Sequence, residues 1–179
     1  MANYGITNST NYAAQPATTT TYTPLIVIAA SSGSFVSAPT NTGLRRSKVY
    51  DILMGTNGSP ADNFIEWVVQ RATVGSSTVW AGSISSGSSL FALDPADAGF
   101  ASFVTVNATA TSSTLFTLQQ IPWYEGMNQR ASYRWVAAPG SEIVIPAVSS
   151  ATGSNGLVFG VRSGGYTGTA TMTVLFQEQ

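Results

Sequence analysis

The chain has 179 residues, which is enough for one domain with a substantial hydrophobic core. Hydrophobic residues make up an ordinary 44%, whereas charged residues make up only 8% against the usual ~25%, and the net charge of −1 does not favour binding to nucleic acid. Because cysteine and histidine are absent, disulfides, thiolate metal sites, a cysteine nucleophile and the usual physiological general base are excluded.

The low charge predicts a neutral surface rich in Ser, Thr, Asn, Gln and Gly, which another protein covers with little charge desolvation. Such a surface suits subunit packing or a secreted all-β protein better than a highly charged cytosolic enzyme. The N-terminus lacks the basic start and apolar core of a signal peptide. The longest aliphatic run, Leu25–Ala30, is shorter than the ~20 residues of a membrane span. We therefore expect a soluble protein without a membrane partner, inside the cell that makes it.

The first 24 residues carry no charged side chain and mix Thr, Asn, Ala and Tyr, which predicts an extended N-terminal arm over residues 1–24. Tyr4, Tyr12 and Tyr22 would let such an arm anchor on a neighbouring subunit. A floppy tail is the alternative interpretation of the same composition.

From residue 25 onward, short β-favouring runs are separated by clusters of Gly, Ser, Asn and Pro, which predicts one β domain over residues 25–179. The predicted strands are Leu25–Ala30, Lys48–Met54, Phe64–Thr73, Ser77–Ile84, Ala101–Val106, Thr114–Gln119, Arg130–Ala137, Glu142–Pro146, Gly156–Ser163 and Thr167–Gln177. In the last of these, apolar residues from Ala170 to Phe176 alternate with a mostly threonine face. The segment 93–102 holds at most one helical turn after Pro95, with Asp94 as its cap. This number of short strands predicts a sandwich, jelly roll or barrel.

Charged residues concentrate between Arg45 and Arg71. This window holds seven of the fifteen charged residues of the chain: Arg45, Arg46, Lys48, Asp51, Asp62, Glu66 and Arg71. We interpret it as two strands whose charges fix their register and line an inter-subunit surface. Possible ion partners for Arg71, Arg130 and Arg134 are Asp51, Glu66 and Glu142.

The inventory for catalysis is thin. Asp94 with Asp97, and Asp62 with Glu66, are the close acidic pairs, and both lie in sequences typical of turns, where Asp and Asn bond to nearby backbone amides. A serine nucleophile would have only Lys48 as a base. We expect no catalytic residues, no cofactor, no metal ion and no small-molecule substrate.

Aromatic residues offer a second interpretation. Trp67 and Trp135 lie in strand patterns and are expected in the core. Trp80 is assigned neither to the core nor to the surface, and the pair Trp123–Tyr124 follows a proline in a loop where both rings are candidates for exposure. Exposed rings of this kind stack on sugars, so a glycan-binding module stays open as an alternative.

Two longer stretches, KVYDILMGTNGSPADNFIEWVVQRAT at 48–73 and NQRASYRWVAAPGSEIVIPA at 128–147, carry a resemblance. They are similar, in the same order, to the hallmark segments of a group of small virion proteins of tailed phages and prophages. LDPADA at 93–98 and YTGTATMTVLFQEQ at 166–179 also fit that pattern. The residues before 25 and the Ser-rich STVWAGSISSGSS at 77–89 depart from it.

The resemblance implies an all-β, jelly-roll-like antiparallel β-sandwich that serves as a non-enzymatic part of the phage particle, and the composition of residues 1–24 adds the extended N-terminal arm. Within that class we predict a capsid cement or decoration protein, made in the host cytoplasm and bound to the major capsid protein on the capsid exterior as a homotrimer. The predicted contact residues are Tyr4, Tyr12, Tyr22, Arg45, Arg46 and Lys48, and the candidate exposed aromatic contact is Trp123 with Tyr124. The alternative is a tail-tip or fibre-associated module that binds a glycan or receptor through Trp123, Tyr124 and Trp80.

Overall fold

The computed structural model describes residues 1–8, 22–30, 46–75, 90–97, 103–106, 116–146, 153–163 and 168–179. Over these residues the protein is all-β, with twelve strands and no helix. In chain order the strands are β1 (Ala2–Thr7), β2 (Thr23–Ala30), β3 (Ser47–Gly58), β4 (Phe64–Gly75), β5 (Leu90–Ala92), β6 (Phe103–Val106), β7 (Phe116–Leu118), β8 (Trp123–Asn128), β9 (Tyr133–Val136), β10 (Ile143–Ile145), β11 (Gly153–Ser163) and β12 (Gly168–Glu178).

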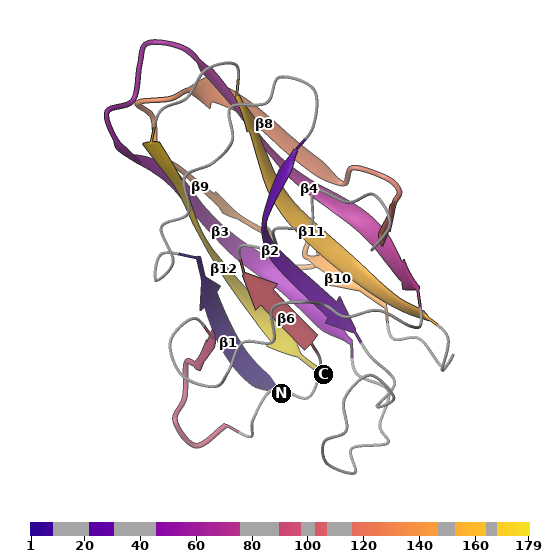
Figure 1. Cartoon of the computed structure of the whole chain (residues 1–179). Coiled ribbons are helices and arrows are strands. Elements are labelled where there is room, and N and C mark those ends of the chain that lie inside the picture. Colours follow the sequence, from indigo (N-terminus) through magenta and orange to yellow (C-terminus); the bar gives the residue numbers. More distant parts are fainter. Residues whose placement is uncertain are drawn as a thin grey trace.

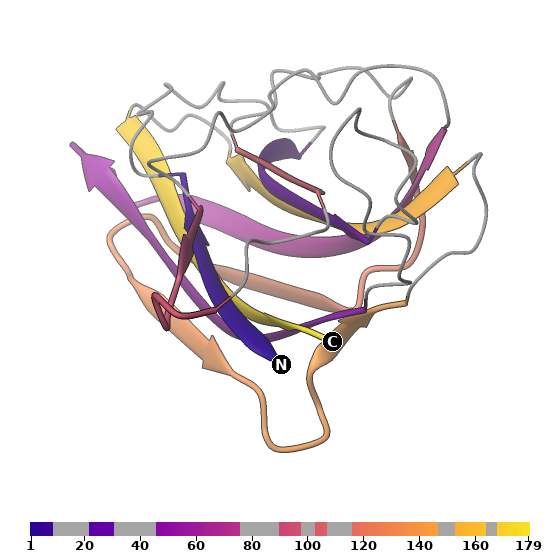
Figure 2. The same ribbon diagram turned by 90° about the horizontal axis from the view of Figure 1, so that it is seen from below.

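The strands form two antiparallel sheets that pack face to face, as Figures 1 and 2 show from two directions. The first sheet has the order β10-β3-β12-β1-β5, and β9 also pairs with β3. The second has the order β6-β2-β11-β4-β7, and β8 also pairs with β4. The predicted antiparallel β-sandwich is confirmed at this level.

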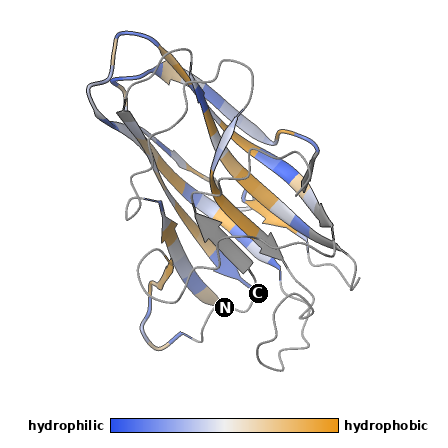
Figure 3. Ribbon diagram, in the orientation of Figure 1, coloured by the Kyte–Doolittle hydropathy of each residue, from blue (hydrophilic) through white to orange (hydrophobic). Residues whose placement is uncertain are grey.

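The hydrophobic core lies between the two sheets, and its largest side chains are Trp67, Phe159 and Phe176. Along β12, the residues from Ala170 to Phe176 that were predicted to face inward are all buried, and Figure 3 shows apolar residues along the central strands. Strand β4 differs, because Val68 on its outer face is as fully buried as Trp67 on its inner face. Simple alternation therefore describes the first sheet better than the second.

One edge of each sheet is built from two short strands laid end to end. Strands β9 and β10 both pair with β3, and the loop 137–142 between them projects from the sandwich (Figure 2). Strands β7 and β8 both pair with β4, and Arg71 exchanges backbone hydrogen bonds of 2.7 and 2.8 Å with Gln119 and Gln120 between them. The long strands β3 and β4 are thus each paired on one side with two short strands, in place of one continuous strand.

The first eight residues belong to the folded body, which differs from the arm predicted over 1–24. Strand β1 lies between β12 and β5, with Tyr4 and Ile6 in the core. The side chain of Asn8 extends the pairing, because it donates to the carbonyl of Ala170 at 3.0 Å and accepts from the N–H of Met172 at 2.6 Å. Composition concealed this strand because the residues that alternate with its two core side chains are small or polar. Residues 9–21 lie outside the described part of the chain.

Nine of the ten predicted strands have a counterpart in the structure, and the remaining one, Ser77–Ile84, lies outside the described residues. Strands β1, β5 and β8 were not predicted. The predicted turn after Asp94 is confirmed, since its carboxylate accepts from the N–H of Ala96 at 2.9 Å. The two strands of segment 48–71 do not pair with each other: β3 and β4 lie in opposite sheets.

Candidate functional site at the junction of the two motifs

The two motifs that carry the resemblance meet at one end of the sandwich. Residues 59–63 lead the chain from β3 in the first sheet to β4 in the second, and residues 129–132 lead it back from β8 to β9. The two connections lie against each other, and the N–H of Gln129 donates to the carbonyl of Asn63 at 2.8 Å. We call this contact the motif junction and define it by residues 56–64 and 128–134.

Gln129 is the centre of the motif junction. It is fully buried, and its side-chain oxygen accepts from the N–H of Ala61 at 3.1 Å. Its side-chain nitrogen donates to the hydroxyl of Ser163 at 2.8 Å and, more weakly, to the carbonyl of Phe64 at 3.4 Å. The hydroxyl of Thr56 donates to the Gln129 carbonyl. Through its side-chain amide and its backbone carbonyl, Gln129 thus ties together the ends of β3, β4 and β11, which satisfies polar groups that would otherwise be costly to bury.

The residues on either side of Gln129 hold the outer surface of the junction. Asn128 donates to the carboxylate of Asp62 and accepts from the N–H of Arg130 at 2.9 Å. The Arg130 guanidinium reaches the carbonyl of Pro60 at 3.4 Å. These contacts are exposed and individually worth little, but they fix the direction in which the turn leaves the sheet.

Asp51 and Arg134 join the same two motifs further along β3. The carboxylate of Asp51 is almost fully buried, and it accepts from Nε of Arg134 at 3.1 and 3.2 Å and from Nη2 at 2.6 Å. This two-pronged contact raises the pKa of Arg134. The predicted availability of Asp51 as a partner for one of the arginines is confirmed, and the pair lies within one chain.

Glu66 pairs with Arg162, which is not among the arginines predicted above as its possible partners. The two are directly opposite on β4 and β11, and Arg162 donates to the Glu66 carboxylate. The hydroxyl of Tyr22 also donates to Glu66 at 3.0 Å, and its ring lies 4.8 Å from the Arg162 guanidinium carbon. Burial, followed by the hydrogen bond to Glu66, raises the pKa of Tyr22 above its ordinary value of 10.0.

The remaining predicted contact residues are dispersed. Tyr4 stacks on Phe176 in the core at a centroid distance of 5.7 Å and is therefore not a surface anchor in this fold. Arg46 is exposed beside the C-terminus, where its backbone exchanges hydrogen bonds with Gln179, and Lys48 is half-buried on β3. Tyr12, Arg45 and Trp80 lie outside the described residues.

The two aromatic residues proposed for sugar stacking have different environments. Trp123 is half-buried, packs against the core and stacks on Tyr133 with centroids 6.3 Å apart. Tyr124, the next residue on β8, points the other way and is 58% exposed. Trp67 is fully buried as predicted, and Trp135 is partly buried against the core. Only Tyr124 of this pair is thus presented to solvent as a large ring.

The acidic residues weighed for catalysis each have a structural contact. Asp94 caps its turn, and Asp97 accepts from the N–H of Asn3 at 2.9 Å, which holds the turn against β1. Asp62 and Glu66 take part in the contacts given above with Asn128 and Arg162. Within the described ranges, no three Asp, Glu, His or Cys side chains gather to hold a metal ion. The arrangement is that of side chains that fix strands and turns.

Comparisons with protein-family models, with curated proteins and with solved structures found no match for this chain. In the part of the chain that the structure describes, no helix is long and apolar enough to cross a membrane. The fold and the motif junction are therefore the observations from which a function is argued.

Proposed function

We propose that the chain is a virion structural protein of a tailed phage, a capsid cement or decoration protein that stabilises the outer capsid lattice. The motif junction carries this proposal. Residues of the two motifs that looked available for chemistry contact each other or the ends of neighbouring strands, as Asp51 does with Arg134. A protein whose most distinctive polar residues are used to fix its own fold suits a structural role better than a catalytic one.

The proposed topology is that of a jelly roll, a fold common in viral capsid proteins. The strand order supports it: β1, β12, β3 and the β9/β10 edge are neighbours in one sheet, and β2, β11, β4 and the β7/β8 edge are neighbours in the other. Successive strands from β1 to β4, and from β10 to β12, alternate between the sheets. Strands β5 and β6 then extend one side of each sheet as an insertion between β4 and β7.

In this proposal the protein binds the major capsid protein on the capsid exterior as a homotrimer, after synthesis in the host cytoplasm. The surface suits repeated contacts, because a chain with 8% charged residues is covered with little charge desolvation. Arg46 and Lys48, with Tyr12 and Arg45, are the proposed contact residues. Many weak contacts on one lattice reinforce each other through effective concentration.

The first test is the copy number of the protein per purified particle, measured by quantitative mass spectrometry against the major capsid protein. We expect a number comparable to that of the capsid subunits. A handful of copies would contradict the lattice position and favour a tail or portal location. Complete absence from particles would contradict the virion role.

A second test replaces residues 9–21 with a Gly/Ser segment of equal length, which leaves β1 joined to β2. We expect the variant to keep its fold by circular dichroism and to lose binding to capsids in co-sedimentation. The matched control replaces Arg130 with Gln, which changes an exposed side chain of the motif junction. Capsid binding by the Gly/Ser variant at wild-type strength would contradict the role proposed for this segment.

The second candidate function is a glycan- or receptor-binding module of a tail tip or fibre. The exposed ring of Tyr124 is the observation that favours it, because an aromatic face open to solvent stacks on sugar rings. A glycan array with the wild-type chain and the Tyr124→Ser variant tests it. Binding that survives the substitution, or an array without any signal, would count against Tyr124 as the contact.

A further inference from the structure

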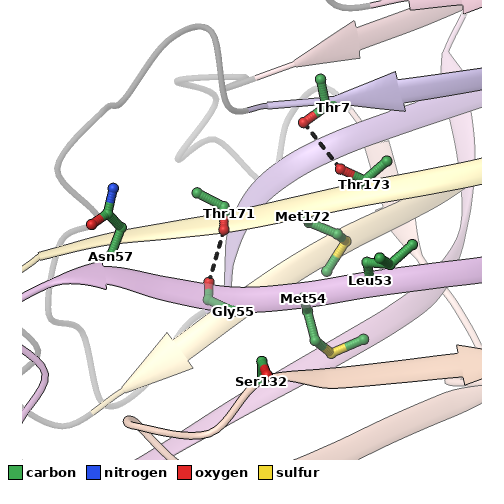
Figure 4. Close-up of a pocket in the computed structure, with 9 residues that line it drawn as sticks. All are labelled: Thr7, Leu53, Met54, Gly55, Asn57, Ser132, Thr171, Met172 and Thr173. Atoms are coloured by element: carbon green, nitrogen blue, oxygen red, sulfur yellow. Dashed lines mark hydrogen bonds between the residues drawn. The ribbon is translucent and has the colours of Figure 1, made fainter.

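An open groove crosses the outer face of the first sheet, away from the core (Figure 4). Its volume is about 410 Å³, within the range of ligand sites. Strands β3 and β12 form the floor, the end of β1 forms one side, and Ser132 before β9 forms the other. The lining residues are Thr7, Leu53, Met54, Gly55, Asn57, Ser132, Thr171, Met172 and Thr173.

The lining of the groove is uncharged and combines a mostly apolar surface with a few hydroxyl groups. Thr171 donates its hydroxyl hydrogen to the carbonyl of Gly55, and Thr173 donates to the hydroxyl of Thr7, both at 3.2 Å. These bonds orient the two donating hydroxyls, whose oxygens still have lone pairs to accept hydrogen bonds. Leu53, 39% exposed, adds an apolar surface beside them. None of the lining residues is ionisable, and Arg134, the residue opposite Leu53 on β9, is bound to Asp51.

Gly55 is the least expected residue of the groove, because glycine weakens the interior of a strand. Other glycines have a steric reason. A side chain at Gly5 would meet the ring of Phe91 at 2.3 Å, and one at Gly126 would meet the ring of Phe64 at 2.7 Å. At Gly55 a Cβ atom would meet only the Cβ of Ser132, at an ordinary 3.7 Å, and no positive φ is required there. A Cβ atom would therefore be accommodated at Gly55, and a larger side chain there would project into the groove.

A glycine inside a strand often marks a bulge, a bend or a place where a ligand or another backbone approaches closely. The register of β3 and β12 does not shift at Gly55, which excludes a bulge between them there. An extended peptide added as a further strand is a poor candidate, because the edges of β3 and β12 in the groove floor are already hydrogen-bonded to each other. Anionic and cationic ligands would lack an ionic partner among the lining residues. A neutral molecule that carries both hydroxyl groups and an apolar C–H face matches the lining in charge, in hydrogen bonding and in apolar surface.

We propose that this groove binds one sugar residue of a neutral glycan. The hydroxyls of the sugar donate to the oxygens of Thr171 and Thr173, and its C–H face rests on Leu53 and on the open backbone at Gly55. The site is separate from Tyr124, which lies on β8 in the other sheet, and it does not depend on the proposed capsid role.

The test is a titration of the ¹⁵N-labelled full-length chain with glucose, galactose, mannose and N-acetylglucosamine, followed by two-dimensional NMR. Each sugar is taken to ~50 mM, because an open site for one sugar residue gives millimolar affinity. We expect saturable amide shifts at 53–57 and 171–173 with at least one sugar. Shifts centred on 123–124 instead, or no saturable shift with any of the four sugars, would overturn the proposal.

Three variants sharpen the result. Gly55→Val fills the groove and is expected to weaken binding at least tenfold, whereas Tyr124→Ser, in the other sheet, is expected to leave it unchanged. Thr173→Val keeps the side-chain shape but removes one of the two accepting oxygens, and it is expected to weaken binding severalfold even where Gly55→Val fails to fold. Unchanged affinity in the folded Gly55→Val variant would overturn the proposal. The proposal would also be overturned if the amide shifts at the groove changed with protein concentration in the absence of sugar. Such a change would indicate that the groove contacts a second copy of the chain.

Discussion

The buried amide of Gln129 should be one of the most sensitive polar positions in the protein. Gln129→Ala removes two side-chain hydrogen bonds of 2.8 and 3.1 Å and one weak bond of 3.4 Å. At about 1 kcal/mol for each of the two good bonds, and about 1 kcal/mol for the cavity, the free energy of unfolding should fall by about 3 kcal/mol. For a chain of this length, that corresponds to a decrease in Tm of roughly 6–12 °C.

Equilibrium unfolding in urea, with unchanged m-values as the criterion for a comparable transition, measures this loss. Gln129→Met keeps most of the volume, so it isolates the hydrogen bonds and should cost about 2 kcal/mol. The matched control is Gln120→Ala, the same change at an exposed glutamine, which should stay within about 0.5 kcal/mol of wild type. If both Gln129 variants were also within that margin, the motif junction would not stabilise the fold as argued.

Other consequences of the structure are open to direct measurement. Because the pKa of Tyr22 is raised in the folded state, its contribution to stability is present below pH 10.0 and lost as the pH rises above that value. The free energy of unfolding of Tyr22→Phe should therefore fall less steeply with alkaline pH than that of wild type, and identical slopes would contradict the burial of Tyr22 and its hydrogen bond to Glu66. Trp123→Ala should lower stability by about 2 kcal/mol and Tyr124→Ala by less than about 0.5 kcal/mol, and a reversed order in thermal denaturation would contradict their burial. Ile6→Ala should lower the free energy of unfolding by about 3 kcal/mol, whereas an unchanged value would contradict the burial of β1 and favour an N-terminal arm.

Sequence periodicity predicted the strands best where one face is buried and the other is open. The mostly threonine face of β12 alternates with a row of buried apolar residues, so its pattern could be read directly. The same reasoning fails for strand β4, because Glu66, Val68 and Gln70, which alternate with Ile65, Trp67 and Val69, are buried although a period-two pattern would place them on an open face. Strand β1 was missed because only Tyr4 and Ile6 mark it as a core strand, within a segment whose composition resembles a linker.

The candidate site was less accessible to sequence reasoning than the strands. Asp51 and Arg134 are 83 residues apart, and Gln129 and Ser163 are 34 apart, so their contacts depend on which strands become neighbours. A glutamine in a turn between polar residues is typical of an exposed position. Its burial follows from the docking of one sheet-to-sheet connection on another, which local pattern does not encode. For the groove, the sequence offered Gly55 as a signal, because this glycine directly follows the predicted strand Lys48–Met54.

The motif junction also changes what the resemblance to phage virion proteins implies. The two hallmark segments contact each other through Gln129 and through the pair of Asp51 with Arg134, so each fixes the position of the other. Because these residues hold the two sheets together, their presence in a sequence indicates the fold and does not indicate what the surface binds. Of the features that differ from the resemblance, Tyr22 contacts Glu66 of the first hallmark segment, whereas residues 9–21 and 77–89 lie outside the described residues. If the proposed capsid role holds, differences in attachment should arise from surfaces other than the motif junction. Substitutions in the motif junction should act on attachment only through stability, which is why the capsid-binding and sugar-binding experiments compare variants that remain folded.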